Sequence, residues 1–453
     1  MTTYQTALFI FRRDLRLIDN SALNAALGSS KHVIASFIFD DRQIKAHSYQ
    51  SKPALHFMLQ SLADLAEQLK NNNADLALFH GLPTQVIEQL HAQQNIQAVF
   101  INRDYTPFSR QRDAEIADIC QRLTIALHVV PDALLTEPEH ALKSDGSAYK
   151  VFTAFYNNAR QFPVDLPQDL QNGQFLTVAS TTTLEAIARL SDGTIATAQG
   201  GRKAAMQRLD ELTDCADYAI TRDFPALQST SQLSAHLKFG TASVREVFHD
   251  IARDLGTEHP LLRQLYWRDF LTHIAYHFPK VFGHAFIDKF DKLTWDNNRD
   301  YFQAWADGKT GFPIVDAGMR ELNSTGFMHN RVRMIVASFL TKDLRISWRW
   351  GERYFAQHLV DYDPCLNNGN WQWAASTGCD AQPYFRIFNP WLQQQKFDAN
   401  GDYMYRWIPE IRAVPIKTLH QWDKKHYGDF YPAPIINHSV EVAITKERFK
   451  IMA

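Results

Sequence analysis

The chain has 453 residues, of which 45% are hydrophobic, and its formal net charge at neutral pH is −2. This length allows two or three domains with large buried cores, and the charge excludes a generally basic surface, so any DNA contact must use a local patch of lysine and arginine. The four cysteines form no C-x-x-C pair, which argues against a structural zinc site and for a reducing compartment. Neither a cationic leader nor a membrane-length apolar run occurs, so we expect a cytoplasmic protein without a membrane span.

Short apolar runs alternate with amphipathic helical patterns from residue 1 to about 130. The clearest helical pattern covers residues 51–70, where apolar residues recur every three or four positions. This alternation predicts an α/β domain over residues 1–130, built on a doubly wound parallel sheet of five strands. The expected strands are residues 7–11, 33–39, 76–79, 98–101 and 125–130.

The sequence after residue 130 is expected to form a connection and then a helical domain. Residues 131–200 show weak periodicity and frequent proline, which is typical of an interdomain connection, although residues 149–156 resemble the start of a helix. Residues 201–453 follow a helical pattern, with a capping box from Ser243 to Glu246. No G-x-G-x-x-G run follows the first strand, so a standard dinucleotide site is not expected there.

All ten tryptophans lie in the C-terminal part of the chain, from Trp267 onward, and Trp371 and Trp373 flank a single glutamine. Tryptophan fills cores, stacks on flat ligands and relays electrons. Its concentration beside polar residues therefore suggests a flat cofactor or a base, with a large aromatic core as the equally weighted alternative.

Three polar segments are candidates for ligand contact. The hydroxyls of residues 230–234 precede a helical pattern and could hold a phosphate, although ordinary helix capping is the commoner use of such residues. Arg331 and Arg333 stand near a helix start, where the helix dipole disfavours cations, so both need anionic partners; Asp361 and Asp363 are available for Arg333. Around Trp267 an aromatic, a cation and an anion lie together and could contact a ligand. The alternative interpretation is a structural tryptophan beside a surface ion pair.

Six segments, in chain order, resemble the photolyase/cryptochrome family, in particular its class I cyclobutane pyrimidine dimer photolyases. The resemblance runs from about residue 7 to residue 415. The segments are Phe11-Arg12-Arg13-Asp14-Leu15-Arg16-Leu17, Tyr149-Lys150-Val151-Phe152-Thr153, Thr230-Ser231-Gln232-Leu233-Ser234, Trp267-Arg268-Asp269-Phe270, Asn330-Arg331-Val332-Arg333-Met334 and Asn367-Asn368-Gly369-Asn370-Trp371-Gln372-Trp373.

The resemblance implies an all-α C-terminal domain that binds FAD and an N-terminal domain that holds an antenna chromophore. Asn367 matches the residue that faces flavin N5, where an uncharged amide favours the fully reduced, active flavin. The implied FAD-binding residues are Tyr218, Thr230, Ser231, Gln232, Leu233, Ser234, Arg268, Arg333, Asp361, Tyr362, Asp363 and Asn367.

The implied reaction is repair of a cyclobutane pyrimidine dimer by an electron from excited reduced FAD, with damaged DNA, single- or double-stranded, as the partner of a monomeric enzyme. Trp295, Trp348 and Trp371 match the family's electron-relay chain. Gln264 and Asn367 complete the implied catalytic set. The implied contacts to DNA and the lesion are Arg222, Gln264, Trp267, Asn330, Arg331, Met334, Trp373 and Gln393.

Gln264 departs from the class I pattern, because a glutamate usually stands at this position. Glutamine resembles (6-4) photolyases and animal-type cryptochromes, which carry a histidine where this chain has the segment from Asn330 to Met334. A (6-4) photolyase and a blue-light-sensing cryptochrome without repair activity are therefore the alternatives. The Asn-Glu pair of folate-binding members is not apparent, which makes a folate antenna less expected without excluding it. A deazaflavin, a second flavin and an empty antenna site stay open.

Overall fold

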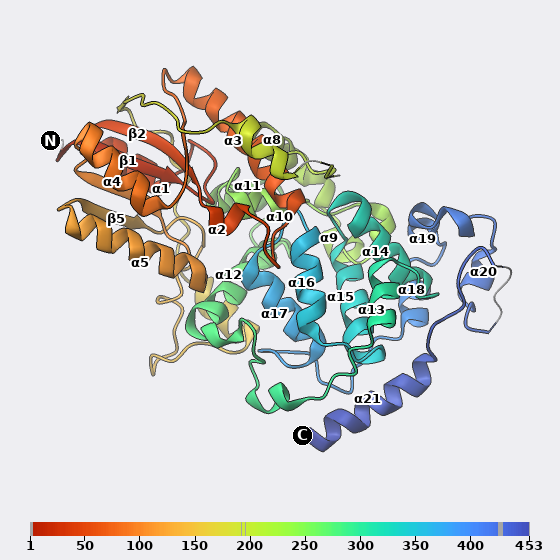
Figure 1. The fold of residues 1–453 in the computed structure, drawn as a ribbon. Helices are drawn as coiled ribbons and strands as arrows, with labels where there is room; N and C mark the ends of the chain where they lie inside the picture. Colours follow the sequence, from red (N-terminus) through yellow and green to blue (C-terminus); the bar gives the residue numbers. More distant parts are fainter. Residues whose placement is uncertain (1–2, 192, 195, 425–428, 453) are drawn as a thin grey trace. The chain divides into compact units, whose positions relative to one another are not determined.

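The computed structural model describes residues 3–191, 193–194, 196–424 and 429–452, which form two compact units. We call them the α/β unit and the helical unit, and Figure 1 shows the elements of each. The α/β unit comprises Met1–Thr194, Ala198–Ala216 and Ser231–Pro279, and the helical unit comprises Ile195–Thr197, Asp217–Thr230 and Lys280–Ala453. No helix in the described part of the chain is long and apolar enough to cross a membrane.

The five expected strands form a parallel sheet in the order β3-β2-β1-β4-β5, which confirms the doubly wound topology. A sixth, two-residue strand, β6, pairs with β2 from within the expected connection, which the sequence did not predict. The strands are β1 (Tyr4–Phe11), β2 (Ser30–Phe39), β3 (Ala77–His80), β4 (Ala98–Asn102), β5 (Ala126–Val130) and β6 (Gln174–Phe175).

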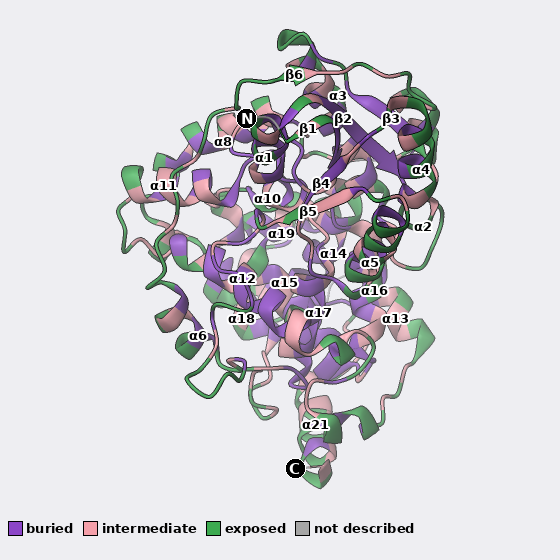
Figure 2. Ribbon diagram, turned by 90° about the vertical axis from the view of Figure 1, so that its left-hand side faces the viewer, coloured by how far each residue is buried: buried purple, intermediate pink, exposed green. Residues whose placement is uncertain are grey.

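Continuous apolar runs along the central strands give the sheet two buried faces, because successive side chains point to opposite sides. Leu8 pairs with Ile34 and Val99 in the ladders, and these residues share a core with apolar residues of α4 and α5. Most of the strand residues are buried, as the purple strands of Figure 2 show. The helix expected at residues 51–70 is α3, and Ser51 caps it by accepting a hydrogen bond from the N–H of Ala54.

Helices surround this sheet and complete the α/β unit. The capping box of α11 forms as predicted, because Ser243 and Glu246 each accept from the backbone N–H of the other. The α/β unit also includes α10 to α12, which lie beyond residue 200. The compact units do not test the expected domain boundaries at residues 130 and 200, which stay predictions. The helices are α1 (Ser21–Ser29), α2 (Asp41–Ile44), α3 (Lys52–Asn71), α4 (Pro83–Gln94), α5 (Pro107–Arg122), α6 (Phe152–Ala159), α7 (Leu184–Ala188), α8 (Arg202–Asp210), α10 (Ser234–Phe239), α11 (Val244–Asp254) and α12 (Leu262–His277).

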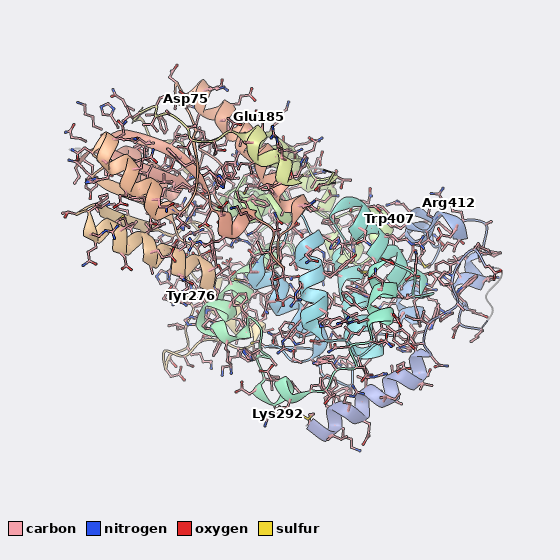
Figure 3. All side chains as sticks on the ribbon, in the orientation of Figure 1. Asp75, Glu185, Tyr276, Lys292, Trp407 and Arg412 are labelled. Atoms are coloured by element: carbon pink, nitrogen blue, oxygen red, sulfur yellow. The ribbon has the colours of Figure 1, made fainter. Side chains whose placement is uncertain are left out.

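The helical unit is built around one aromatic core. Trp305, Trp348, Trp371 and Trp422 are almost completely buried in it. Figure 3, in which Trp407 is labelled, shows the side chains of this unit. Its helices are α9 (Tyr218–Thr221), α13 (Arg299–Ala306), α14 (Pro313–Thr325), α15 (Asn330–Ser338), α16 (Trp348–His358), α17 (Pro364–Ala375), α18 (Pro390–Phe397), α19 (Asp402–Trp407), α20 (Ile416–Leu419) and α21 (His438–Met452).

A π-helical segment, Phe339–Asp343, extends α15 and carries a buried lysine. The Lys342 ammonium donates to the carbonyl of Ala375 at 3.0 Å and to the hydroxyl of Ser376 at 2.8 Å. It also lies 3.9 Å from the centre of the Phe449 ring on α21. Burial lowers the pKa of Lys342 to about 7, because a charge without a carboxylate partner is costly in an apolar core.

Candidate functional site

The expected site residues fall into two groups, one in each unit. The group in the α/β unit consists of Ser231, Gln232, Leu233, Ser234, Gln264, Trp267 and Arg268. The group in the helical unit consists of Tyr218, Arg222, Thr230, Trp295, Asn330, Arg331, Arg333, Met334, Trp348, Asp361, Tyr362, Asp363, Asn367, Trp371, Trp373 and Gln393.

In the α/β unit, residues 231–234 lead into the short helix α10. Leu233 is buried, whereas Gln232 and Ser234 are exposed. Gln232 has φ 52°, a left-handed conformation that turns the chain into the helix. Among the described residues, the hydroxyls of Ser231 and Ser234 have no hydrogen-bond partner, so both can serve a ligand.

Trp267 is held flat against a second aromatic ring. It stacks on Phe152 of α6 with ring centroids 3.6 Å apart and planes within 8°. Gln264 lies one turn earlier on α12 and is half-buried, so the two side chains share one side of the helix. The stack fixes the plane of the Trp267 indole, which is the property that a base-stacking residue needs.

The ion pair expected next to Trp267 forms, with Arg268 and Asp269 3.7 Å apart, but it is not at the surface, because Asp269 is completely buried. One of its carboxylate oxygens accepts from the backbone N–H groups of Leu135 and Thr136, at 2.8 and 3.0 Å. Burial raises the pKa of Asp269 to about 7. Arg268 also donates to the carbonyl of Ala133 at 2.5 Å.

In the helical unit, both arginines of α15 have the anionic partners that the sequence required. Arg333 pairs with Asp361 at 2.9 Å, as expected. Arg331 pairs with Asp223 at 2.8 Å, a partner that the sequence did not indicate. The guanidinium of Arg331 also lies 4.5 Å from the centre of the Phe397 ring, so the side chain is held on two sides.

Asn330 and Met334 occupy one face of α15, because the Asn330 amide lies 3.9 Å from the Met334 sulfur. On the next segment, Asp363 caps α17 by accepting from the N–H groups of Cys365 and Leu366. The second carboxylate oxygen of Asp361 is buried and lacks a hydrogen-bond partner among the described atoms. A buried acceptor of this kind fits a donor on a bound molecule.

Asn367 of α17 is buried with its amide fixed. Its Nδ2 donates to the carbonyl of Glu352 at 2.9 Å. Asn368 donates to the carboxylate of the same glutamate at 2.9 Å and accepts from Gln372 at 3.0 Å, which ties α16 to α17. Because the Nδ2 of Asn367 is engaged by a carbonyl, its Oδ1 is the atom available as an acceptor for a ligand.

The three tryptophans of the expected relay all contribute to the core of the helical unit. Trp348 and Trp371 are buried, whereas Trp295 is half-buried beside Phe290 and Phe449. A Cβ atom at Gly351 would lie 2.1 Å from the Trp371 ring, so only glycine allows α16 to approach α17 here. Trp373, two residues further on, is half-buried at the margin of this core.

Trp371 also contacts aromatic residues that the sequence did not single out. Its ring centroid lies 4.9 Å from that of Phe355 and 6.2 Å from that of Trp305. The only signal of Trp305 in the sequence is its residue type, because nothing around position 305 repeats the pattern near Trp371.

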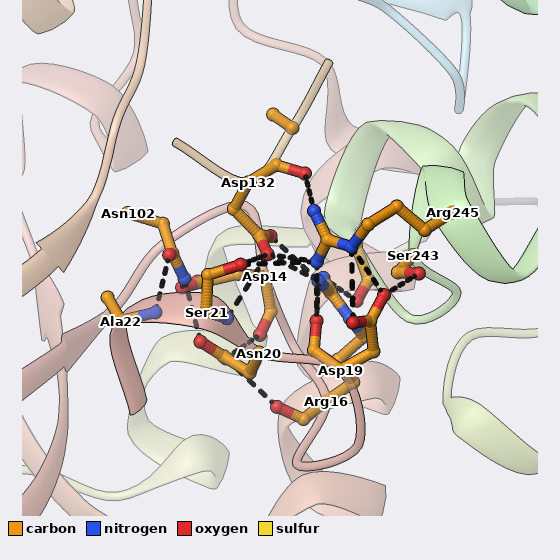
Figure 4. Close-up of polar contacts among 12 residues, drawn as sticks. Asp14, Arg16, Asp19, Asn20, Ser21, Ala22, Asn102, Asp132, Ser243 and Arg245 are labelled. Atoms are coloured by element: carbon orange, nitrogen blue, oxygen red, sulfur yellow. Dashed lines mark hydrogen bonds and ion pairs between the residues drawn. The ribbon is translucent and has the colours of Figure 1, made fainter. Parts of the chain in front are cut away.

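Polar residues gather at the carboxyl ends of β1 and β4 in the α/β unit. Figure 4 shows the network, in which Arg16 pairs with Asp132 at 2.7 Å and Arg245 with Asp19 and Asp132 at 2.9 and 2.8 Å. The cavity beside it measures about 10 Å³, room for one water. Its lining residues are Arg12, Arg13, Asp14, Asn102, Arg103, Asp104, Asp132 and Ala133.

Two protein-family models match the chain. The model described as DNA photolyase matches residues 7–171, and the model described as the FAD binding domain of DNA photolyase matches residues 261–451. The two matches cover strands β2 to β5, most of β1 and most of the helices described above.

Relatives of known name match over nearly their full length. A deoxyribodipyrimidine photo-lyase of Synechococcus is 39% identical, with 96% of this chain and 94% of the relative covered. The deoxyribodipyrimidine photo-lyase of Escherichia coli K12 is 37% identical, with 97% and 96% covered.

Solved structures give the same result. The photolyase of Sulfolobus tokodaii, whose crystal structure holds two FAD molecules, superposes with a TM-score of 0.90 at 41% identity and covers 99% of this chain and 100% of its own. A class III photolyase of Agrobacterium tumefaciens has a TM-score of 0.91 at 32% identity, with 100% and 98% covered. A cryptochrome of Synechocystis has a TM-score of 0.88 at 29% identity, with 99% of each chain covered.

Proposed function

The chain belongs to the DNA photolyase family, and on that premise we propose that it repairs cyclobutane pyrimidine dimers in DNA with FAD and light. It is an enzyme, a deoxyribodipyrimidine photo-lyase. The observation that carries this function is the shared name of its relatives, since the Synechococcus and Escherichia coli proteins are 39% and 37% identical over nearly the whole chain. The cryptochrome match, at 29% identity, does not favour the signalling alternative.

The described residues fit FAD. Bound FAD supplies the light-excited electron that splits the dimer. The buried oxygen of Asp361 that has no partner among the described atoms offers an acceptor to the cofactor, and the Arg333 guanidinium holds the other oxygen of this carboxylate in place. We assign the phosphates and the ribityl chain to Tyr218, Thr230 and the residues from Ser231 to Ser234. Ser231 and Ser234 support this assignment through their unpartnered hydroxyls.

Asn367 is assigned to flavin N5. The carbonyl of Glu352 holds its Nδ2 and leaves Oδ1 as an acceptor, which suits the N5–H of reduced flavin better than the bare N5 of oxidised flavin. The residue therefore holds the proton at N5 without exchanging it, because an amide has no titratable group. This selectivity favours the fully reduced form that repair requires.

Trp267 and Trp373 are assigned as the walls that stack on the flipped dimer, with Gln264, Asn330 and Met334 as further contacts. Stacking contributes about 1–3 kcal/mol per base, comparable to the few kcal/mol needed to unstack a damaged step. The Phe152 stack supports this role, because a wall that is already flat need not be ordered when the lesion binds.

Arg222, Arg331 and Gln393 are assigned to the DNA backbone around the lesion. The pairing of Arg331 with Asp223 and Phe397 supports a preorganised contact, since the side chain is already ordered before DNA arrives. The enzyme acts as a monomer on single- or double-stranded DNA in the cytoplasm.

Trp371, Trp348 and Trp295 are assigned to the relay that reduces oxidised FAD after light absorption. Their burial gradient supports the assignment, because two are enclosed in the core and Trp295 is half-buried. This order of burial is the one that a relay from the protein surface to the flavin requires.

An antenna chromophore in the α/β unit is proposed as a folate, a deazaflavin or a second flavin, the last because the Sulfolobus tokodaii structure holds two FAD molecules. The cavity of about 10 Å³ at the ends of β1 and β4 does not hold any of these with its arginines as they stand. Arg12 pairs with Asp113, and Arg13 with Asp104 at 3.2 Å, so a chromophore there must displace these ion pairs. The absorption spectrum of the purified protein beyond the FAD bands identifies the chromophore.

Anaerobic repair of a thymine-dimer oligonucleotide under blue light tests the function. Reduced, FAD-loaded protein is expected to restore intact thymines, whereas the dark control restores none. A (6-4) lesion is treated in parallel, and repair of that lesion in place of the dimer would refute the assignment. Absence of repair of either lesion would support the signalling alternative.

A further inference from the structure

Lys342 is a buried cation, and its burial destabilises the helical unit. The residue is 1% exposed, and among the described residues no carboxylate pairs with its ammonium. The carboxylate next to it in sequence, that of Asp343, pairs with His438 instead. Replacing a buried charge with an apolar side chain of similar size often stabilises a protein, so a lysine here points to a function other than stability.

The backbone at Lys342 is as unusual as its side chain. The residue lies in the π-helical segment Phe339–Asp343, and no other π-helical segment occurs in the described ranges. Such turns are rare and are frequently found at functional sites. From this segment the ammonium reaches the end of α17, where it donates to the carbonyl of Ala375 at 3.0 Å and to the hydroxyl of Ser376 at 2.8 Å.

The chain leaves α17 through a strained residue that Lys342 contacts. Ser376 has φ 62° and ψ 25°, the left-handed conformation that residues other than glycine rarely adopt. Its N–H donates to the carbonyl of Trp373 at 3.2 Å, and the next two N–H groups donate to the carbonyl of Gln372 at 3.0 and 3.1 Å. The hydrogen bond from Lys342 therefore holds the residue on which this turn of backbone hydrogen bonds depends.

Opposite charges lie at the two ends of α17. The carboxylate of Asp363 accepts from two backbone N–H groups at the first turn, at 2.9 and 3.2 Å, and the Lys342 ammonium lies at the last turn. Both charges match the helix dipole, which is positive at the N-terminus and negative at the C-terminus. The helix between them carries Asn367, Trp371 and Trp373, and Trp373 stands two residues before the carbonyl that Lys342 binds.

We propose that Lys342 is a positioning residue for lesion binding: its ammonium orders the last turn of α17 and so fixes the indole of Trp373, on which the flipped dimer stacks. This inference rests on the proposed function, because it requires Trp373 as a wall of the lesion pocket. Lys342 belongs to none of the recognised motifs, and it acts through the backbone of α17 rather than by touching the lesion.

Lys342 also contacts α21, but through different atoms. Its backbone carbonyl accepts from the hydroxyl of Thr445, and its ammonium lies 3.9 Å from the centre of the Phe449 ring. If Lys342 served only to hold α21, its loss would lower stability and affect α17 no more than any other loss of a contact to α21. Because Thr445 bonds the carbonyl and not the ammonium, Thr445→Val tests the attachment of α21 separately.

The test uses full-length, FAD-loaded protein at about pH 6, below the pKa of about 7 that burial gives Lys342, so that the ammonium form predominates. In Lys342→Met we expect the thermal midpoint to rise while affinity for a thymine-dimer duplex, measured in the dark by fluorescence anisotropy, falls about five- to tenfold. Affinity for the undamaged duplex should not change, because Trp373 stacks only on the flipped lesion. A purely structural lysine would move stability and dimer affinity in the same direction.

Hydrogen exchange measures the order of α17 without any lesion. We expect the N–H groups of Ser376 and the two residues after it to exchange about tenfold faster in Lys342→Met, while those of α14 stay unchanged. Thr445→Val is the matched control: it should lower the thermal midpoint through loss of a buried hydrogen bond, with dimer affinity and exchange at these three groups as in the wild type. FAD content is measured for every variant.

Ser376→Ala decides the question if Lys342→Met does not bind FAD. It removes one of the two acceptors of the ammonium and should weaken dimer affinity about two- to threefold.

Three results would overturn the positioning role. They are unchanged dimer affinity in Lys342→Met, or in Ser376→Ala where that variant replaces it; unchanged exchange at the end of α17; and an equal loss of dimer affinity in Thr445→Val. Wild-type protein that binds the dimer no better than undamaged DNA would contradict the proposed function. Lesion-specific binding by the wild type together with unchanged binding by Lys342→Met would contradict only the role of Lys342.

Discussion

The stack of Trp267 on Phe152 gives a quantitative prediction about lesion recognition. Phe152 is 1% exposed, and Phe152→Leu keeps an apolar side chain there while removing the flat partner of the Trp267 ring. Aromatic pairs contribute about 0.5–1.5 kcal/mol beyond burial. If Trp267 needs this support to stack on the flipped dimer, the variant should bind a dimer-containing duplex about two- to tenfold more weakly.

Fluorescence anisotropy in the dark measures this effect, with a labelled duplex that contains one thymine dimer and an undamaged duplex of the same sequence. Phe155→Leu is the matched control, because Phe155 lies on the same helix and is completely buried but contacts Phe270 and His273. We expect affinity for undamaged DNA to be unchanged in both variants. Equal loss of dimer affinity in Phe152→Leu and Phe155→Leu would show that general destabilisation of α6, not the stack, is responsible.

Three further predictions concern single residues. Lys342→Met should raise the free energy of unfolding at pH 7 by about 2 kcal/mol. Burial lowers the pKa of Lys342 from 10.5 to about 7, which destabilises the folded protein by about 4 kcal/mol at pH 7. The substitution removes this cost but also loses two hydrogen bonds, which contribute about 1 kcal/mol each. Between pH 7 and pH 10.5 the unfolded state binds more protons than the folded state, so the stability of the wild-type protein rises with pH. The stability gained by Lys342→Met, measured by urea unfolding, should therefore shrink from pH 7 to pH 9. Lys450→Met on the surface of α21 is the control and should show no such trend. Gln264→Glu should increase the quantum yield of dimer repair, because a carboxylate restores the residue usual at this position; an unchanged yield would mean that the glutamine is no handicap. Gly351→Ala should destabilise the protein by about 1–3 kcal/mol and slow photoreduction, because its Cβ would lie 2.1 Å from the Trp371 ring; a variant with unchanged thermal midpoint and photoreduction would contradict this contact.

Local patterns were sufficient to predict much of the fold. The five strands of the sheet and helix α3 have strong apolar periodicity, and the structure confirms them. Strand β6 has only two residues and no periodicity, so nothing in its sequence could reveal that it pairs with β2. The π-helical segment that carries Lys342 was equally undetectable, because its composition is that of an ordinary buried helix.

The sequence showed which residues require an interaction partner more reliably than it showed which residue the partner is. The position of Arg331 near a helix start showed that it required an anion, but Asp223 lies 108 residues away and no local signal links the two. The partner of Arg333 was found because Asp361 belongs to a recognisable acidic segment. Phe152 belonged to a recognised motif, yet its stack on Trp267 depends on how α6 and α12 meet, which only tertiary packing determines. The site roles of the remaining residues stay predictions.

The ion pairs of Arg245 have a consequence for synthesis of the chain on the ribosome. Asp132 leaves the ribosome 113 residues before Arg245, a delay of roughly 6–23 s at the usual rate of translation. Until α11 leaves the ribosome, Asp19 lacks the Arg245 guanidinium that donates to both of its carboxylate oxygens. This part of the polar network at the end of the sheet is therefore incomplete during that time. A nascent chain stopped near residue 200 therefore lacks the ion pairs of Arg245 with Asp19 and Asp132, which form only after the residues that follow the sheet have been translated.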